Sequence, residues 1–289
     1  MRSFVLCLLA GVGLAATASA DGPAIREIPD LVFGKGGGTD LRLDVAMPAD
    51  GDGPFPVVVC IHGGGWVDGD RRQMTGAMQA LARRGFVAVS PDYRLAPHDP
   101  FPAQIEDCKA AVRWLRANAQ IYKIDPDHIG ALGFASGGHL AELLAVTAAE
   151  DGLEGTGGNS DQSSRVQAVA SFFSPTDLTA PCWNADVTAK NLIPLIGGTI
   201  ADKPEAYRKA SPLTYAGKNS AALLIFHGDH DKIVPLEQSQ LLAAKINAAG
   251  GVARVIVLEG EGHDPRPDKL LGCIRQMTSF FDAQLKQKP

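Results

Sequence analysis

The sequence predicts an α/β fold with a mostly parallel central sheet and helices on both of its faces. Strand-like and helix-like segments alternate from one end of the 289-residue chain to the other, which is typical of this class. The segment 55–61 (FPVVVCI) is a continuous apolar run, as expected for a central strand buried on both faces. No internal repeat or long linker divides the sequence, so we expect residues 21–289 to form one domain.

The remaining elements follow from local patterns along the chain. Residues 25–33 and 41–47 are expected to open the sheet as an antiparallel pair around the glycine turn at 36–38. The segment 178–212 interrupts the alternation, and we interpret it as a small insertion over the C-terminal ends of the strands, where ligands bind in open α/β sheets. Further strands are expected at 86–90, 129–134, 166–173, 222–226 and 253–258, and helices at 104–118, 139–149, 236–249 and 269–286.

The first twenty residues have the pattern of a targeting segment. Arg2 supplies a positive start, residues 4–16 are almost all apolar, and the small residues Ala18 and Ala20 stand at the −3 and −1 positions of a cleavage site. The apolar run is too short to span a bilayer as a helix. We therefore expect a cleavable signal peptide over residues 1–20, a mature chain from about Asp21, secreted or periplasmic localisation and no stable membrane insertion.

Composition and cysteine usage exclude several classes of partner and cofactor. The net charge is −5 and no cluster of Lys and Arg is present, which argues against nucleic acid. No CxxC spacing indicates a metal or disulfide framework, and the run HGDHD after residue 226 fits no metal-ligand set. We expect no metal and no cofactor. One disulfide is compatible with an oxidising compartment, but the sequence does not pair the four cysteines that remain after cleavage, Cys60, Cys108, Cys182 and Cys273.

A glycine-rich turn, HGGGW at residues 62–66, directly follows the predicted central strand. Glycines allow the backbone N–H groups to turn inward, where those of Gly64 and Gly65 would stabilise a developing oxyanion. Glycine-rich turns after strands also bind phosphates, but neither a GxGxxG nor a Walker pattern is present. The oxyanion interpretation is therefore favoured, and we call residues 62–66 the oxyanion turn.

Two further residues stand at the ends of predicted strands. Asp231 follows the strand at 222–226, and His263 follows the last strand. An imidazole can take and return a proton near neutral pH, and it needs an acceptor that fixes its tautomer. The chain order of nucleophile, Asp and His is the order of α/β-hydrolases. These observations predict a Ser-His-Asp-type mechanism with Asp231 orienting and His263 as base and acid.

The expected nucleophile position is occupied by alanine. The turn GFASGG at residues 133–138 joins a strand to a helix, and a sharp nucleophile elbow needs small residues two before and two and three after its tip. A tip at Ala135 places glycines at all three positions. A tip at Ser136 places Phe134 and His139 at two of them. The glycines therefore predict Ala135 at the tip and Ser136 one position late.

Several motifs resemble a known group of enzymes. The runs HGGGW, SPDYRLAP (90–97) and FPAQIED (101–107), with DQSSRVQAV (161–169) and PTD (175–177), resemble the bacterial esterase group that includes feruloyl and acetyl-xylan esterases and is related to the hormone-sensitive-lipase family. The resemblance covers essentially all of the mature chain. It implies an α/β-hydrolase fold, Asp231 and His263 as acid and base, and the N–H of Ser136 as the second half of the oxyanion hole. Where the family has G-x-S-x-G-G-H-L, this chain has GFASGGHL.

The alanine leaves alternatives open. Ser136 could serve as an off-register nucleophile, or the chain could be a slowed hydrolase or a non-catalytic protein that binds esters or carbohydrate. Losing a triad serine costs on the order of 10⁶ in kcat and leaves about 10³–10⁴ over water, so reduced or absent esterase activity is favoured. A peptidase-like amide hydrolase on the same fold is a weaker alternative. Trp66 and Trp183 are candidate contacts for the substrate, an ester that is either a small molecule or linked to a polysaccharide.

Overall fold

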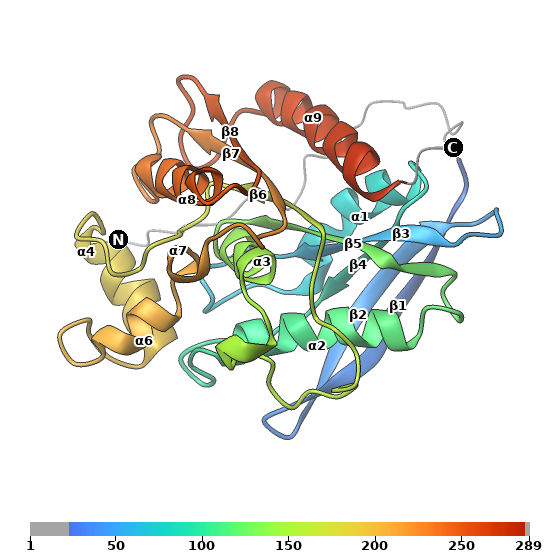
Figure 1. Cartoon of the computed structure of the whole chain (residues 1–289), viewed down its shortest axis with the longest axis horizontal. Coiled ribbons are helices and arrows are strands. Elements are labelled where there is room, and N and C mark those ends of the chain that lie inside the picture. The colour runs from blue at the N-terminus through green and yellow to red at the C-terminus, as the bar shows by residue number, and fades with distance from the viewer. Residues whose placement is uncertain (1–22, 287–289) are drawn as a thin grey trace, which may run out of the picture.

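The computed structural model describes residues 23–286, and the predicted signal peptide lies outside this range. Within it, eight strands form one sheet in the order β1-β2-β4-β3-β5-β6-β7-β8 (Figure 1). The strands are β1 (Ile25–Gly36), β2 (Thr39–Pro48), β3 (Phe55–Ile61), β4 (Val87–Pro91), β5 (Ile124–Phe134), β6 (Ala168–Phe172), β7 (Ala222–Gly228) and β8 (Ala253–Leu258).

The sheet is antiparallel at one edge and parallel elsewhere. β1 pairs with β2 and β2 with β4 in antiparallel register, while every other neighbouring pair is parallel. On the central strand, Val59 stands opposite Val89 on one side and Ala131 on the other. All three are fully buried, as the apolar run predicts. The parallel arrangement places the C-terminal ends of β3 and β5–β8 along one edge of the sheet.

Helices cover both faces of the sheet. The face with Leu115, Leu140 and Leu242 forms one apolar cluster, and the face with Met78 and Phe281 forms a second. The first cluster packs under α2, α3 and α8, and the second under α1 and α9; Figure 1 shows α9 and α2 on opposite sides of the sheet. The helices are α1 (Thr75–Ala82), α2 (Ala103–Ala117), α3 (Ser136–Val146), α8 (Glu237–Ala248) and α9 (Pro267–Leu285), with short 3-10 turns η1 (Arg71–Met74) and η2 (Ala149–Asp151).

The segment 178–212 contains short helical turns that contact the C-terminal side of the strands. The N–H of Phe101 donates to the carbonyl of Leu195 at 2.7 Å, and Asn184 donates to the carbonyl of Lys232 at 3.2 Å. Lys232 directly follows Asp231, so the segment is attached beside the predicted site. Its elements, with the turn that follows, are α4 (Ala185–Val187), the π-helical turn η3 (Thr188–Leu192), α5 (Ile193–Ile196), α6 (Pro204–Lys209) and α7 (Pro212–Tyr215).

Several elements differ from the sequence-based prediction. Helix α3 begins at Ser136 rather than at residue 139, and α1 was not predicted. The early start of α3 was hidden by Gly137, a residue type that indicates loops. A Cβ on Gly137 would lie 2.2 Å from the carbonyl oxygen of Ile61, so glycine is required there by close packing of the helix on β3. β5 also extends back to Ile124.

Two further properties concern the described residues. Cys60, Cys108, Cys182 and Cys273 are free thiols, and only Cys182 is exposed. Between residues 23 and 286, no helix is long and apolar enough to cross a membrane.

Candidate active site

The turn between β5 and α3 has its tip at Ala135. This residue has φ 49° and ψ −116°, in the left-handed region that non-glycine residues rarely adopt. Its N–H donates to the carbonyl of Phe172 at 2.9 Å, which ties the turn to the neighbouring strand. A Cβ on Gly133 would lie 2.2 Å from the carbonyl oxygen of Gly137, so the turn closes too tightly for a side chain at that position. The glycine spacing therefore located the tip at the residue that carries the strained conformation.

Ser136 lies on the buried side of this turn. It is the first residue of α3 and is only 2% exposed, and its hydroxyl packs toward Tyr93. Within residues 23–286 the Ser136 Oγ has no hydrogen-bond partner. This hydroxyl therefore makes no hydrogen bond to His263 in the described part of the chain, and a nucleophilic role for Ser136 stays a prediction.

Asp231 and His263 meet although they are far apart in sequence. Nδ1 of His263 lies 2.8 Å from Oδ2 of Asp231. Oδ1 of Asp231 accepts the N–H groups of Ile233 and Val234 at 2.8 and 2.9 Å, so the carboxylate is held by its own loop. Because the carboxylate accepts the Nδ1 proton, Nε2 of His263 carries the lone pair that can take a proton from a reactant.

A second imidazole contacts the same carboxylate. The ring of His227 is fully buried, with Nδ1 2.6 Å from the hydroxyl of Ser239 and Nε2 2.8 Å from the carbonyl of Val234. Nε2 also lies 3.4 Å from Oδ2 of Asp231. Burial alone would raise the pKa of Asp231, but the hydrogen bonds from His227 and His263 outweigh it and hold that pKa well below its ordinary value. Asp231 is therefore an anion at neutral pH.

Phe173 links His263 to the elbow. Its ring centroid lies 4.8 Å from that of His263 and 6.1 Å from that of Phe134, the residue before Ala135. Phe173 follows β6 and has φ 43°, and like Ala135 and Trp66 it lies at a strand tip in a region that non-glycine residues rarely adopt. Sequence reasoning missed Phe173, because an aromatic residue at the end of a strand is indistinguishable from an ordinary core residue. The structure shows it as the surface against which the imidazole packs.

The oxyanion turn uses a carbonyl group for its internal hydrogen bonds and leaves the N–H groups of Gly64 and Gly65 unused. Gly64 and Gly65 have φ values of +115° and +62°, which only glycine adopts readily. The carbonyl of Gly64 accepts the N–H groups of Val67 and Asp68 at 3.2 and 3.1 Å. In the described part of the chain, the N–H groups of Gly64, Gly65 and Ser136 donate to no protein acceptor. Unused backbone donors from two turns are what an oxyanion site requires.

His62 has a structural position behind this turn. Its Nδ1 lies 2.8 Å from the carbonyl of Gly63, and its ring stacks on Tyr93 with centroids 4.2 Å apart. Burial lowers the pKa of His62, so the ring is neutral.

The two candidate tryptophans differ in position. Trp66 is 2% exposed and its indole N–H donates to Nδ1 of His139 at 3.1 Å, while Nε2 of His139 donates to the carbonyl of Ala210 at 2.7 Å. The suggestion that Trp66 contacts substrate is therefore corrected, because its ring is part of the core wall. Trp183 is half-buried, and its indole N–H donates to the carbonyl of Asp177 at 3.1 Å.

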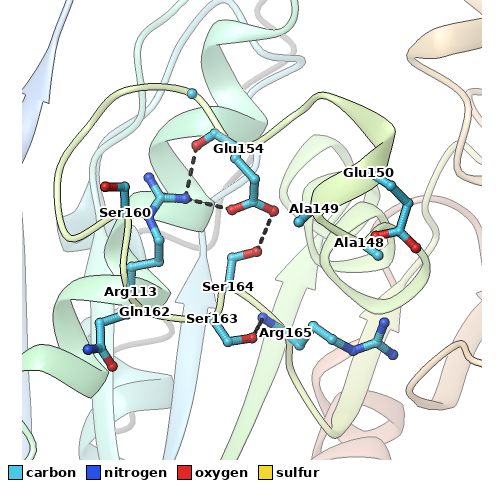
Figure 2. A pocket seen from close by; sticks show the side chains of 11 residues that line it. Arg113, Ala148, Ala149, Glu150, Glu154, Ser160, Gln162, Ser163, Ser164 and Arg165 are labelled. Carbon is cyan, nitrogen blue, oxygen red and sulfur yellow. Dashed lines mark hydrogen bonds and ion pairs between the residues drawn. The ribbon is translucent and has the colours of Figure 1, made fainter.

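A polar pocket lies away from these residues, near the C-terminal end of α3. It is lined by residues of α2 and of the 148–165 segment, among them Arg113, Glu154 and Ser164 (Figure 2). Because α3 starts at the elbow, the end of this helix lies at the opposite edge of the sheet from the strand tips. No group of three or more His, Cys, Asp or Glu residues suited to a metal ion occurs between residues 23 and 286.

Comparison with known proteins gives one family and several relatives. The sequence model of the BD-FAE family matches residues 43–246. Esterase LipQ of Mycobacterium tuberculosis is 31% identical over 232 residues, covering 78% of this chain and 53% of the relative. Esterase LipC of the same organism is 31% identical over 214 residues, covering 73% and 53%. The chain thus spans about half the length of these curated relatives.

Solved structures agree with the topology. A truncated carbohydrate esterase from gut microbiota superposes with a TM-score of 0.80 at 30% identity, covering 92% of this chain and 100% of that one. An esterase of Thermogutta terrifontis, Est2, superposes with a TM-score of 0.74 at 27% identity, covering 91% and 92%. The predicted α/β-hydrolase fold is confirmed by the eight-stranded sheet and by these neighbours.

Proposed function

Because this chain belongs to the BD-FAE family of α/β-hydrolase esterases, we propose that it acts on carboxylic esters with Asp231 and His263 but without a serine nucleophile. The observation that carries the proposal is the 2.8 Å bond between the Asp231 carboxylate and the His263 imidazole, at a site whose elbow ends in a methyl group. A methyl group cannot form an acyl-enzyme, so the covalent route of a serine esterase is closed.

The remaining groups suit direct attack by water. Nε2 of His263 takes a proton from a water molecule as the water oxygen attacks the carbonyl carbon of the ester. The N–H groups of Gly64, Gly65 and Ser136 stabilise the negative charge that develops on the carbonyl oxygen. When the bond to the alcohol oxygen breaks, His263 returns the proton to that oxygen. The products are a carboxylic acid and an alcohol.

The expected rate is low for a member of this fold. Removal of a triad nucleophile costs on the order of 10⁶ in kcat, and the oxyanion site and substrate binding retain about 10³–10⁴ over water. The substrate class follows from the relatives, which are an esterase of a bacterium and a carbohydrate esterase. We propose an ester of a small molecule or an ester linked to a polysaccharide.

A second candidate function is binding without turnover. The observation that favours it is the pair of Ala135 at the elbow tip and the buried hydroxyl of Ser136. In that case the cleft retains the fold and the donors of an esterase but holds an ester or carbohydrate ligand without cleaving it.

The decisive experiment compares hydrolysis of p-nitrophenyl acetate by the natural chain and by Ala135→Ser, Ser136→Ala and His263→Ala. We expect Ala135→Ser to raise kcat by about 10⁴–10⁶, because the hydroxyl restores the acyl-enzyme route. Ser136→Ala should leave the natural rate unchanged, and His263→Ala should abolish any rate above background. A rate in the natural chain that does not depend on His263 would leave the binding function as the better account, and no gain in Ala135→Ser would contradict the assignment of the elbow tip.

Labelling with a fluorophosphonate probe gives an independent readout. The natural chain should not be labelled at Ser136, whereas Ala135→Ser should be labelled at residue 135, as peptide mapping can show. Labelling at Ser136 of the natural chain would show that Ser136 acts as an off-register nucleophile and would contradict this proposal.

Export is a separate part of the proposal. The supporting observation is the charged start, apolar run and small-residue end of residues 1–20. N-terminal sequencing of the protein purified from its own cells or medium should find a first residue at about Asp21, and an intact Met1 would contradict it.

A further inference from the structure

We propose that Asn191, on the segment inserted at residues 178–212, is a positioning residue that holds the oxyanion turn in its donor geometry. The inference rests on the proposed function, because the turn has a catalytic role only if an ester carbonyl binds there. No recognisable motif marks Asn191 in the sequence.

The side chain of Asn191 contacts the backbone of Gly65. Its Nδ2 donates to the carbonyl oxygen of Gly65 at 3.3 Å. A Cβ on Gly65 would lie 2.0 Å from that nitrogen and 3.0 Å from the Cγ of Asn191. Gly65 is therefore needed both for its φ of +62° and for the space that the asparagine side chain occupies. This contact joins the inserted segment to the oxyanion turn.

The peptide groups on both sides of Gly65 are fixed by different parts of the chain. The carbonyl of Gly64 is held within the turn by the N–H groups of Val67 and Asp68. In a trans peptide the N–H points opposite to the carbonyl, so the N–H of Gly65 points away from these partners. The next peptide, between Gly65 and Trp66, is held through its carbonyl by Asn191. Without the hydrogen bond from Asn191, the backbone of Gly65 could rotate, and its N–H group would then move out of the donor geometry.

The segment that carries Asn191 is well anchored. Asn191 lies on η3, a π-helical turn, and such turns are frequent at functional sites. The neighbouring Leu192 and Leu195 are 1% and 0% exposed and pack into the core. The carbonyl of Leu195 also accepts the N–H of Phe101. The asparagine amide is therefore presented to Gly65 from a backbone that is itself fixed.

The test uses the Ala135→Ser background, in which turnover is expected. Adding Asn191→Ala should lower kcat by about 10- to 100-fold with little change in KM, since misplacing a catalytic group by about 1 Å costs up to about 10². Asn191→Asp should lower kcat further, because a carboxylate oxygen would face the Gly65 carbonyl and place negative charge beside the developing oxyanion. The matched control is Lys190→Ala, since this neighbouring side chain is exposed and, within residues 23–286, pairs only with Asp186.

A second measurement does not depend on turnover. Amide hydrogen exchange of a peptide covering residues 62–69 should be faster in Asn191→Ala than in Lys190→Ala, both made in the natural chain. Unchanged kcat in an active Ala135→Ser background would overturn the role of Asn191 and leave the proposed function intact. If Ala135→Ser is inactive, the proposed function fails, and equal exchange in the two variants would then overturn the role of Asn191 as well.

Discussion

Two polar regions at opposite edges of the sheet use buried charge in different ways. At the strand tips, Asp231 is buried with His263, and the N–H groups of Gly64, Gly65 and Ser136 donate to no protein acceptor in the described chain. At the other edge, Glu154 accepts Lys109 and Arg113, each at 2.8 Å (Figure 2 shows Arg113 and Glu154).

In the second region, the charged groups of Lys109 and Arg113 each have several hydrogen-bond acceptors. Nζ of Lys109 also donates to Ser164 at 3.2 Å, and the Arg113 guanidinium donates to the carbonyls of Glu154 and Gly158 at 2.9 and 3.0 Å. Breaking a buried ion pair is strongly destabilising because it leaves one charge uncompensated, whereas backbone donors without protein acceptors are free to bind a ligand. The difference indicates that Glu154 and its partners stabilise the loop at residues 148–165, whereas the strand tips offer backbone donors that no protein group uses in the described chain.

Two buried or half-buried glutamates, Glu142 and Glu154, differ in the direction of their pKa shifts. Glu142 on α3 is fully buried, accepts the Ser171 hydroxyl at 2.7 Å, and has a pKa raised to about 8 by burial. Burial would also raise the pKa of Glu154, but hydrogen bonds and charge from Lys109 and Arg113 outweigh it and lower that pKa. One glutamate is thus neutral at pH 7 and the other is an anion.

The largest expected effect concerns the strand tips. In the Ala135→Ser background, Asp231→Asn should lower kcat by about 10⁴, because an amide cannot hold His263 in the productive tautomer. The matched control is Asp229→Asn, in the same loop, whose carboxylate accepts the N–H of Gly260 at 2.7 Å and makes no hydrogen bond to His263 within residues 23–286. Steady-state kinetics on p-nitrophenyl acetate would measure both. Equal effects of the two substitutions would remove the distinction between catalytic and structural carboxylates.

A smaller effect is expected at the opposite edge. Glu154→Gln should lower the free energy of unfolding by about 3 kcal/mol, since it leaves the fully buried Lys109 ammonium without its counter-ion. Urea denaturation followed by circular dichroism would measure the change. Asp186→Asn, in an exposed pair with Lys190, should cost less than about 1 kcal/mol. The double variant Lys109→Met with Glu154→Gln should regain part of the loss, and a double variant less stable than Glu154→Gln would contradict this account.

The last expected effect is a pH dependence of stability. A carboxyl whose folded pKa is about 8 and whose unfolded pKa is near 4.5 binds more protons in the folded state between those values, so its contribution to stability falls as pH rises through that window. Glu142→Gln keeps the acceptor for Ser171 and cannot ionise. Its stability relative to the natural chain should therefore increase by about 1 kcal/mol for each pH unit and level off above about pH 8. Urea midpoints at pH 5, 7 and 9 would test this, and parallel curves would mean that Glu142 is already ionised in the folded protein.

Much of the fold and part of the site could be predicted because their signals are local. The central strand at 55–61 and the last strand at 253–258 have the predicted bounds, since apolar runs between turn residues define them. The glycine spacing at residues 133–138 likewise located the strained tip at Ala135, because steric requirements within one turn involve only adjacent residues.

The sequence by itself determined where most strands lie along the chain and that a sharp turn has Ala135 at its tip, since each of these depends on neighbouring residues. Only the tertiary structure decided which side of the elbow the Ser136 hydroxyl occupies, that the Trp66 ring is buried, and that Asn191 meets Gly65 across 126 positions of sequence. These depend on the packing of segments that are distant in the chain, and no periodicity within a single segment encodes which side chain of another segment it will meet.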